Sequence, residues 1–149
     1  MEDVLSDVQK AVVRQCDRST MTGLRDAAMI LLLTGFDLSR EACAGLDRED
    51  VAIKDGYVSM VGPKQPGRAR GAPGMLRSSS TDLDPVRAIS EWLEEAAIES
   101  GPLFLSIDRH GKIGDRLSGR SVYNIVRRRA KEAGIEHYTP MMLRRVSAK

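Results

Sequence analysis

The chain has 149 residues, of which 30% are charged and 42% hydrophobic, and its formal net charge at pH 7 is +2. That balance is typical of one folded globular domain, residues 1–149, and excludes a chain that is disordered throughout. The longest strongly apolar run, residues 27–33, is far shorter than the ~20 residues that span a bilayer, and the acidic N-terminus lacks a secretory signal. We therefore expect a cytoplasmic protein with no membrane contact.

The first third of the chain predicts helices. Apolar residues recur at helical spacing over about residues 3–16, which indicates an amphipathic helix. Thr22 is placed to cap a second helix that is apolar almost all round and should run through the core. Gly35 suits the left-handed conformation that ends such a helix. Ser39 can then cap a short helix over residues 40–46.

The apolar period changes after these helices. Two short runs with the character of strands flank the Asp-Gly pair at residues 55–56, which predicts a β-hairpin over residues 50–61. Residues 62–74 are rich in Gly, Pro and Arg and indicate an extended basic loop. A third strand at about residues 73–76 would complete a small antiparallel sheet.

Helices return in the second half. Asp84 and Pro85 predict a helix start with proline at the first helical position. Trp92 belongs to an apolar stripe at helical spacing, so we expect it in the core rather than on a base-stacking surface. A short extended segment at residues 103–105 and a turn at residues 108–111 follow.

The C-terminal part predicts one long helix over residues 119–133, stopped by Gly134, and a last helix that begins after Pro140. The whole pattern indicates an α+β fold, mainly α-helical, with a small three-stranded antiparallel sheet.

Positive charge is gathered into two segments. Residues 63–81 hold four Lys or Arg and no acid, and residues 112–149 hold ten against three acids. A surface that binds a polyanion needs such clustering, because neutralised phosphates release counterions. Charge alone leaves open the alternative of ordinary solvated surfaces.

Metal or redox chemistry finds no support in the sequence. Cys16 and Cys43 have no metal-binding spacing and are expected to be reduced structural thiols. His110 and His137 lie in a predicted turn and loop, where solvation is the expected state. We therefore expect no cofactor and no metal.

Several strings along the chain belong together. They are Gly23–Ala28 with Leu31–Gly35, Leu46–Val51, Gly62–Lys64, Gly101–Leu105, Leu117–Ile135 and the Thr-Pro-x-x-Leu-Arg of Thr139–Arg144. Their order and spacing resemble the catalytic domain of the tyrosine recombinases, the phage integrase and Xer-like family. The resemblance runs the length of the chain and implies that family's fold.

In that family a tyrosine attacks the scissile DNA phosphate, while arginines, a lysine and histidine-type residues act around it. Guanidinium groups suit the negative charge that gathers on the phosphate oxygens, and a lysine suits protonation of the departing sugar oxygen. The tyrosine makes a covalent link that conserves bond energy. The resemblance carries three such positions to this chain, a catalytic-type set of Arg40, Lys64 and Arg144.

The match at these positions is incomplete. The family's first arginine aligns with Asp37 when counted from the preceding Thr-Gly, and with Ser39 when counted back from Leu46. Arg40 is the nearest arginine and could serve through a shifted loop. The family's histidine aligns with Met141, which has no proton to exchange at working pH.

The nucleophile is also missing from its expected place. The family continues beyond its second arginine through further helices that carry the tyrosine, whereas this chain ends at Lys149. Tyr57, Tyr123 and Tyr138 lie elsewhere, and structural roles are favoured for them. We therefore expect a C-terminally truncated domain that does not cleave DNA by itself.

The leading hypothesis is a DNA-binding, integrase- or recombinase-like domain related to site-specific recombination and integration. Its partner would be double-stranded DNA, contacted mainly at phosphates. The predicted DNA contacts, beside the catalytic-type set, are Arg68, Arg70, Arg120, Arg127, Arg128, Arg129 and Arg145. Two alternatives stay open: a fragment of an active site-specific tyrosine recombinase, or a protein-interaction module or non-functional remnant. A homo-oligomer, or a partner that donates a helix at the truncated C-terminus, would be a further partner.

Overall fold

The computed structural model describes residues 6–61, 74–135 and 140–143. Its helices are α1 (Asp7–Val13), α2 (Met21–Gly35), α3 (Arg40–Ala44), the 3-10 turn η1 (Arg48–Asp50), α4 (Pro85–Glu95), α5 (Gly119–Glu132) and α6 (Pro140–Leu143). Its strands are β1 (Val51–Lys54), β2 (Tyr57–Met60), β3 (Met75–Arg77), β4 (Leu105–Ile107) and β5 (Ile113–Arg116). The predicted α+β class with a three-stranded antiparallel sheet is confirmed.

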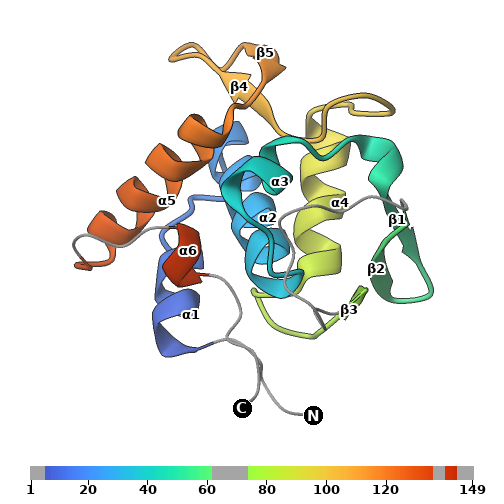
Figure 1. Cartoon of the computed structure of the whole chain (residues 1–149), viewed down its shortest axis with the longest axis horizontal. Helices are drawn as coiled ribbons and strands as arrows, with labels where there is room; N and C mark the ends of the chain where they lie inside the picture. Colours follow the sequence, from blue (N-terminus) through green and yellow to red (C-terminus); the bar gives the residue numbers. More distant parts are fainter. Residues whose placement is uncertain (1–5, 62–73, 136–139, 144–149) are drawn as a thin grey trace.

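Helix α2 runs through the middle of the fold, with α4 against one side and α1 and α3 against others (Figure 1). It is buried along almost its whole length from Arg25 to Gly35, as its apolar sequence predicts. Its N-cap is Thr20, whose hydroxyl accepts a hydrogen bond from the Gly23 backbone N–H at 3.0 Å. The prediction that Thr22 caps this helix is therefore wrong, because Thr22 already lies inside the first turn.

Gly35 has a different role from the predicted one. It is the last residue of α2, and the positive φ of 57° belongs to Asp37, two residues later. A Cβ on Gly35 would lie 2.5 Å from the Cδ1 atom of Leu76 on β3. The glycine therefore allows the sheet to pack closely against the end of α2.

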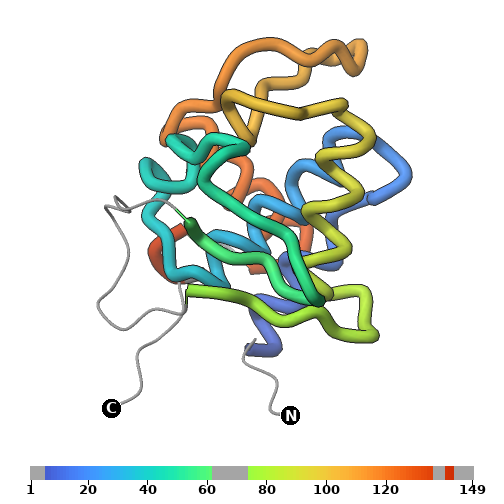
Figure 2. The backbone as a smooth tube through the Cα atoms, turned by 90° about the vertical axis from the view of Figure 1, so that its right-hand side faces the viewer, coloured from blue at the N-terminus to red at the C-terminus, as the bar shows by residue number. Residues whose placement is uncertain are grey.

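The three-stranded sheet has the order β1-β2-β3, and both pairings are antiparallel. Val51 is paired with Met60 across the predicted hairpin, and Tyr57 with Arg77 on the third strand. Val58 is fully buried in the centre of β2, where α4 packs against β2 and β3 (Figure 2). The predicted hairpin and third strand are confirmed.

Helix α4 begins as predicted. Asp84 is its N-cap and accepts a hydrogen bond from the Val86 N–H at 2.9 Å, with Pro85 at the first helical position. Trp92 is fully buried, and its indole N–H donates to the Leu103 carbonyl oxygen at 2.8 Å. The prediction of a core tryptophan is confirmed.

Strands β4 and β5 form a second hairpin that the sequence did not indicate. The Asp108 carboxylate organises its turn by accepting hydrogen bonds from the N–H groups of His110 and Lys112, at 2.8 and 2.9 Å. Strand β5 has three exposed residues in a row, so it lacks the apolar alternation from which a strand is predicted. The hairpin projects beside the start of α5 (Figure 1).

Candidate nucleic-acid interface

Helix α5 presents arginines on its outward face. Ser118 caps it by accepting a hydrogen bond from the Ser121 N–H at 3.0 Å. The face toward the core consists of Val122, Ile125, Val126 and Ala130, all buried. Arg120, Arg127 and Arg128 are exposed. The amphipathic spacing of the apolar residues therefore sends these three cations toward solvent.

Three arginines surround one aromatic ring, that of Tyr123 on α5. The Cζ atom of Arg40 lies 5.0 Å from the ring centroid, that of Arg120 5.7 Å and that of Arg127 5.8 Å. We call these four residues the Tyr123 cluster. Positions 120, 123 and 127 share a helix face because their spacing is three and four residues. Arg40 comes from the first turn of α3, which packs against α5 and is capped by Ser39.

The structure thus brings one predicted catalytic-type residue next to two predicted DNA contacts. Arg40 donates from Nε to the Glu41 carboxylate at 2.8 Å, and this hydrogen bond lowers the pKa of Glu41 below its ordinary value. Among the described residues, no carboxylate lies within ion-pair distance of Arg120, Arg127 or Arg128. The cluster and its neighbour Arg128 therefore carry more positive charge than the local acid neutralises.

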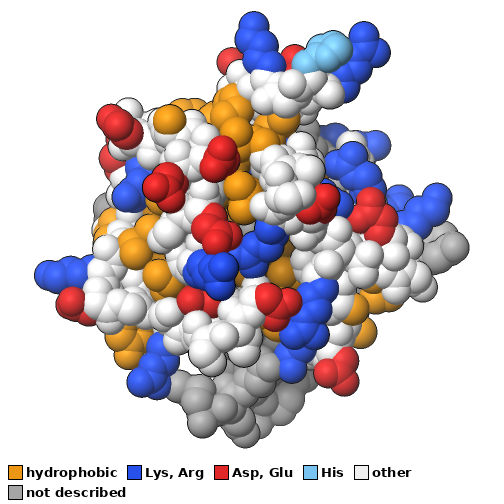
Figure 3. Space-filling model, turned by 180° about the vertical axis from the view of Figure 1, so that it is seen from behind, with side chains coloured by type: hydrophobic (Ala, Val, Ile, Leu, Met, Phe, Trp, Pro, Cys, Tyr) orange, Lys and Arg blue, Asp and Glu red, His pale blue; other side chains and the backbone are white. Residues whose placement is uncertain are grey.

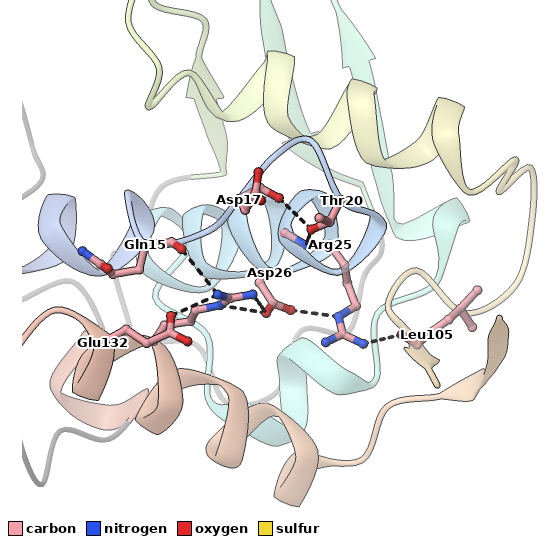
Figure 4. Close-up of polar contacts among 9 residues, drawn as sticks. Gln15, Asp17, Thr20, Arg25, Asp26, Leu105 and Glu132 are labelled. Atoms are coloured by element: carbon pink, nitrogen blue, oxygen red, sulfur yellow. Dashed lines mark hydrogen bonds and ion pairs between the residues drawn. The ribbon is translucent and has the colours of Figure 1, made fainter. Parts of the chain in front are cut away.

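Arg129 faces inward, unlike the two arginines before it. Its guanidinium donates to Asp26 Oδ2 from Nε at 3.0 Å and from Nη2 at 2.8 Å, and to Glu132 at 3.0 Å (Figure 4). Arg25 donates to Asp26 Oδ1 at 2.9 Å from the other side. The Asp26 side chain is 0% exposed and that of Arg129 12%. We call these three residues the Asp26 network.

This placement distinguishes Arg129 from the exposed arginines of α5 with which it was grouped as a predicted DNA contact. Burial lowers the pKa of Arg129, but the charge and hydrogen bonds of Asp26, together with Cys16 and Glu132, raise it, so the net pKa lies above the ordinary value. Both carboxylate oxygens of Asp26 accept hydrogen bonds from guanidinium groups, and among the described residues Asp26 is the only ion-pair partner of the buried Arg25. Successive helical residues point about 100° apart. A run of three arginines on one helix therefore does not form one surface.

The family resemblance aligns two catalytic positions of that family with Asp37 and Met141. Asp37, at one alignment of the first arginine, is buried and has a φ of 57°. Met141, at the histidine position, is on α6 with 76% of its surface exposed. Tyr57 lies on β2, in the sheet. The remaining predicted site residues fall outside the described residues: Lys64, Arg68, Arg70, Arg144 and Arg145, as do His137 and Tyr138.

The opposite side of α2 has a different electrostatic character. An open hollow of about 480 Å³ beside α4 is lined by Arg18, Leu24, Asp82, Arg87, Glu91, Glu94 and Glu95. Its cations are paired, with Arg18 and Arg87 both bonded to Glu91 at 2.8 and 3.0 Å. Figure 3 shows acidic and basic side chains interspersed on the face that lies behind the view of Figure 1. Both arginines that line this hollow are therefore neutralised by Glu91, whereas Arg120, Arg127 and Arg128 have no ion pair among the described residues.

Within the described part of the chain, no group of three His, Cys, Asp or Glu side chains is placed to hold a metal ion. No helix in the same part is long and apolar enough to cross a bilayer. Cys16 and Cys43 are both buried as free thiols, and burial raises the pKa of each to about 12. Neither thiol is therefore a reactive group at neutral pH.

Comparison with known proteins gives consistent relatives. No family model matches the chain. A tyrosine recombinase of Synechocystis sp. is 27% identical over 128 residues, which cover 85% of this chain and 38% of that protein. An integrase/recombinase of Selenomonas ruminantium, a xerD homolog, is 27% identical over 126 residues, which cover 82% of this chain and 37% of that protein. The chain thus spans well under half the length of these relatives.

Solved structures show the same fold. The XerA recombinase superposes with a TM-score of 0.64 at 17% identity, covering 96% of this chain and 46% of the recombinase. The XerH site-specific recombinase, solved on its difH substrate before cleavage, gives a TM-score of 0.58 at 16% identity, covering 91% of this chain and 38% of that one.

Proposed function

Because this chain is a tyrosine-recombinase-family domain, we propose that it binds double-stranded DNA through the outward face of α5 and the first turn of α3. The observation that carries the proposal is the Tyr123 cluster with Arg128. These residues gather four guanidinium groups, and among the described residues only Arg40 has an acidic partner. Exposed arginines of this kind bind backbone phosphates bidentately without reading sequence.

The relatives support DNA as the ligand. One structural neighbour, XerH, was solved on a DNA substrate, and both sequence relatives are recombinases. Site-specific recombination is therefore the process in which we place the domain. Because the chain spans 38% or less of those sequence relatives, the activity of a whole recombinase belongs to the proposal.

We further propose that the described residues do not cleave DNA by themselves. Strand cleavage in the family needs an arginine and a proton-transferring group around the phosphate, and here Asp37 and Met141 occupy aligned positions. Asp37 is buried and Met141 is chemically inert toward protons.

A second candidate is that the chain is one part of a longer, active recombinase. The coverage of the relatives, 38% and 37%, favours this alternative. In that case Arg40, Lys64 and Arg144 would be phosphate-binding and acid positions completed by residues elsewhere. The reading frame around the gene separates the two candidates, because the second requires continuing codons for a histidine and a tyrosine.

The test of DNA binding is fluorescence anisotropy with two unrelated duplexes of about 20 base pairs at 50 mM salt. We expect similar dissociation constants for both duplexes, since phosphate contacts carry no sequence information. Absence of binding to either duplex at this salt concentration would refute the proposed function. Arg87→Ala on α4 is the matched control, because it removes an exposed arginine from the other side of α2 and should leave affinity unchanged.

The test of cleavage is a nicked suicide substrate, on which a tyrosine recombinase accumulates a covalent protein–DNA adduct. We expect no adduct from this chain. An adduct that survives denaturing electrophoresis would contradict the proposed inactivity while leaving DNA binding intact.

A further inference from the structure

We propose that Tyr123 is a positioning residue that holds the guanidinium groups of Arg40, Arg120 and Arg127 together as one preformed phosphate-binding cluster. The inference rests on the proposed DNA-binding function and deepens it by naming the residue that organises the contact. Tyr123 itself carries no charge to contribute, so its role is separable from electrostatic attraction by the arginines.

The geometry supports this role. All three Cζ atoms lie within the ~6 Å of a ring centroid at which a guanidinium is attracted to an aromatic face. Contact through the flat face of a guanidinium leaves its N–H groups, which lie in the guanidinium plane, available to donate hydrogen bonds to phosphate oxygens. The ring therefore fixes where the arginines lie without using the donors that bind the ligand.

The bonding of Arg40 fits the same arrangement. Its Nε donates to Glu41, while neither Nη atom donates to another described residue. The Glu41 carboxylate lies over the start of α5, where a Cβ on Gly119 would approach Oε2 to 3.0 Å. Glu41 thus anchors Arg40 beside α5 through one donor and leaves its terminal nitrogens for a ligand.

The electrostatics of the cluster favour an anion. Three cations around one ring repel each other, and Glu41 neutralises only one of them. A phosphate between the guanidinium groups relieves that repulsion and gains charge-assisted hydrogen bonds. Arginine side chains that are mobile before binding lose conformational entropy when they bind a phosphate. Contact with the Tyr123 ring restricts these side chains beforehand and so reduces that loss.

The experiment compares Tyr123→Phe with Tyr123→Leu in duplex binding at 100 mM salt. Both variants keep every charge. We expect Tyr123→Phe to bind like wild type because the ring remains, and Tyr123→Leu to bind about fivefold more weakly, the loss of roughly one exposed cation–π contribution. Lys131→Ala, which removes an exposed cation from the last turn of the same helix, is the control and should change binding less than Tyr123→Leu.

The outcomes separate the inference from the proposed function. Equal binding by wild type and Tyr123→Leu, with weakening by Arg120→Ala and Arg127→Ala, overturns the positioning role and leaves DNA binding in place. Absence of binding by every form, wild type included, overturns both. Thermal unfolding of each variant shows whether Tyr123→Leu is folded.

A second measurement needs no variant. In the wild-type protein the Nε–Hε NMR signals of the three cluster arginines should shift together on addition of duplex DNA, while that of Arg87 stays in place. Inorganic phosphate is the second probe. Shifts with phosphate alone but not with DNA would overturn the assignment to a nucleic-acid backbone, and independent shifts at different DNA concentrations would overturn the single cluster.

Discussion

The Tyr123 cluster and the Asp26 network use the same residue type on the same helix for opposite purposes. Arg127 is exposed, lies with its Cζ atom 5.8 Å from the centroid of the Tyr123 ring and has no ion pair among the described residues. Arg129, two residues later, is nearly buried and bonded to a fully buried carboxylate. The first arrangement leaves charge available for a ligand, and the second consumes it to dock α5 against α2. The arginines of one helix can therefore have different functions, according to whether their side chains point to solvent or to the core.

The largest effect that separates the two regions should come from Asp26→Ala. Removing the carboxylate leaves the buried guanidinium group of Arg25 without a counter-charge and leaves Arg129 with only Glu132, so we expect a loss of about 4 kcal/mol in the free energy of unfolding. Urea denaturation measures it. A loss below 1 kcal/mol would show that the network contributes little to the fold.

Arg129→Met should lower the free energy of unfolding by somewhat less, about 3 kcal/mol. The variant removes one of the two cationic partners of the buried Asp26 carboxylate, which still pairs with Arg25. The matched variant is Arg127→Met on the exposed face, for which we expect a change within ~0.5 kcal/mol. The same urea experiment compares the pair. Equal destabilisation by both variants would mean that the two faces of α5 are not divided as described.

For DNA affinity we expect the larger effect from the exposed face of α5. The double variant Arg127→Ala/Arg128→Ala should bind both unrelated duplexes about tenfold more weakly at 100 mM salt, since each removed phosphate contact lowers affinity for all sequences alike. Anisotropy titrations on the two duplexes provide the numbers. Weakening on one duplex only would point to base readout in place of phosphate contact.

The smallest effect belongs to the exposed ion pair between Arg14 and Asp82, with Nε–Oδ2 at 3.1 Å. Its hydrogen bond lowers the pKa of Asp82 below the ordinary 3.8, so the pair stabilises the fold above that pH and loses its contribution as pH falls through the lowered pKa. Asp82→Asn should therefore cost no more than about 0.5 kcal/mol at pH 7, and this cost should fall as the pH is lowered through the pKa of Asp82. A cost that does not change with pH would show that the side chain acts by packing.

Local rules predicted much of the fold. The Asp84 and Pro85 helix start, the Asp-Gly hairpin and the buried Trp92 all follow from turn chemistry and apolar spacing, and all are present. Errors arose where tertiary contact overrides the local preference. Gly35 is needed for the approach of Leu76 and not for a left-handed turn, and nothing near it in sequence indicates that contact.

The candidate site was less predictable. Arg40 is predicted only as the arginine nearest to the family's aligned position, and its place beside α5 depends on the packing of α3, some eighty residues away in the chain. The spacing of Arg120, Tyr123 and Arg127 on one helix face was a usable signal for their meeting. One feature of the sequence could have indicated that Arg129 faces the core. Asp26 lies within an apolar helix, and a buried carboxylate requires a cationic partner.

The most direct test of the central claim is the salt dependence of duplex binding between 50 and 200 mM. For wild type we expect a slope of about −3.6 in log affinity against log salt, for four phosphate contacts. Arg120→Ala/Arg127→Ala should reduce the slope to about −1.8, because Arg40 and Arg128 remain, and Lys131→Ala should leave it near the wild-type value. Identical slopes for wild type and the double variant would contradict the account, because DNA would then be bound elsewhere than on the Tyr123 cluster.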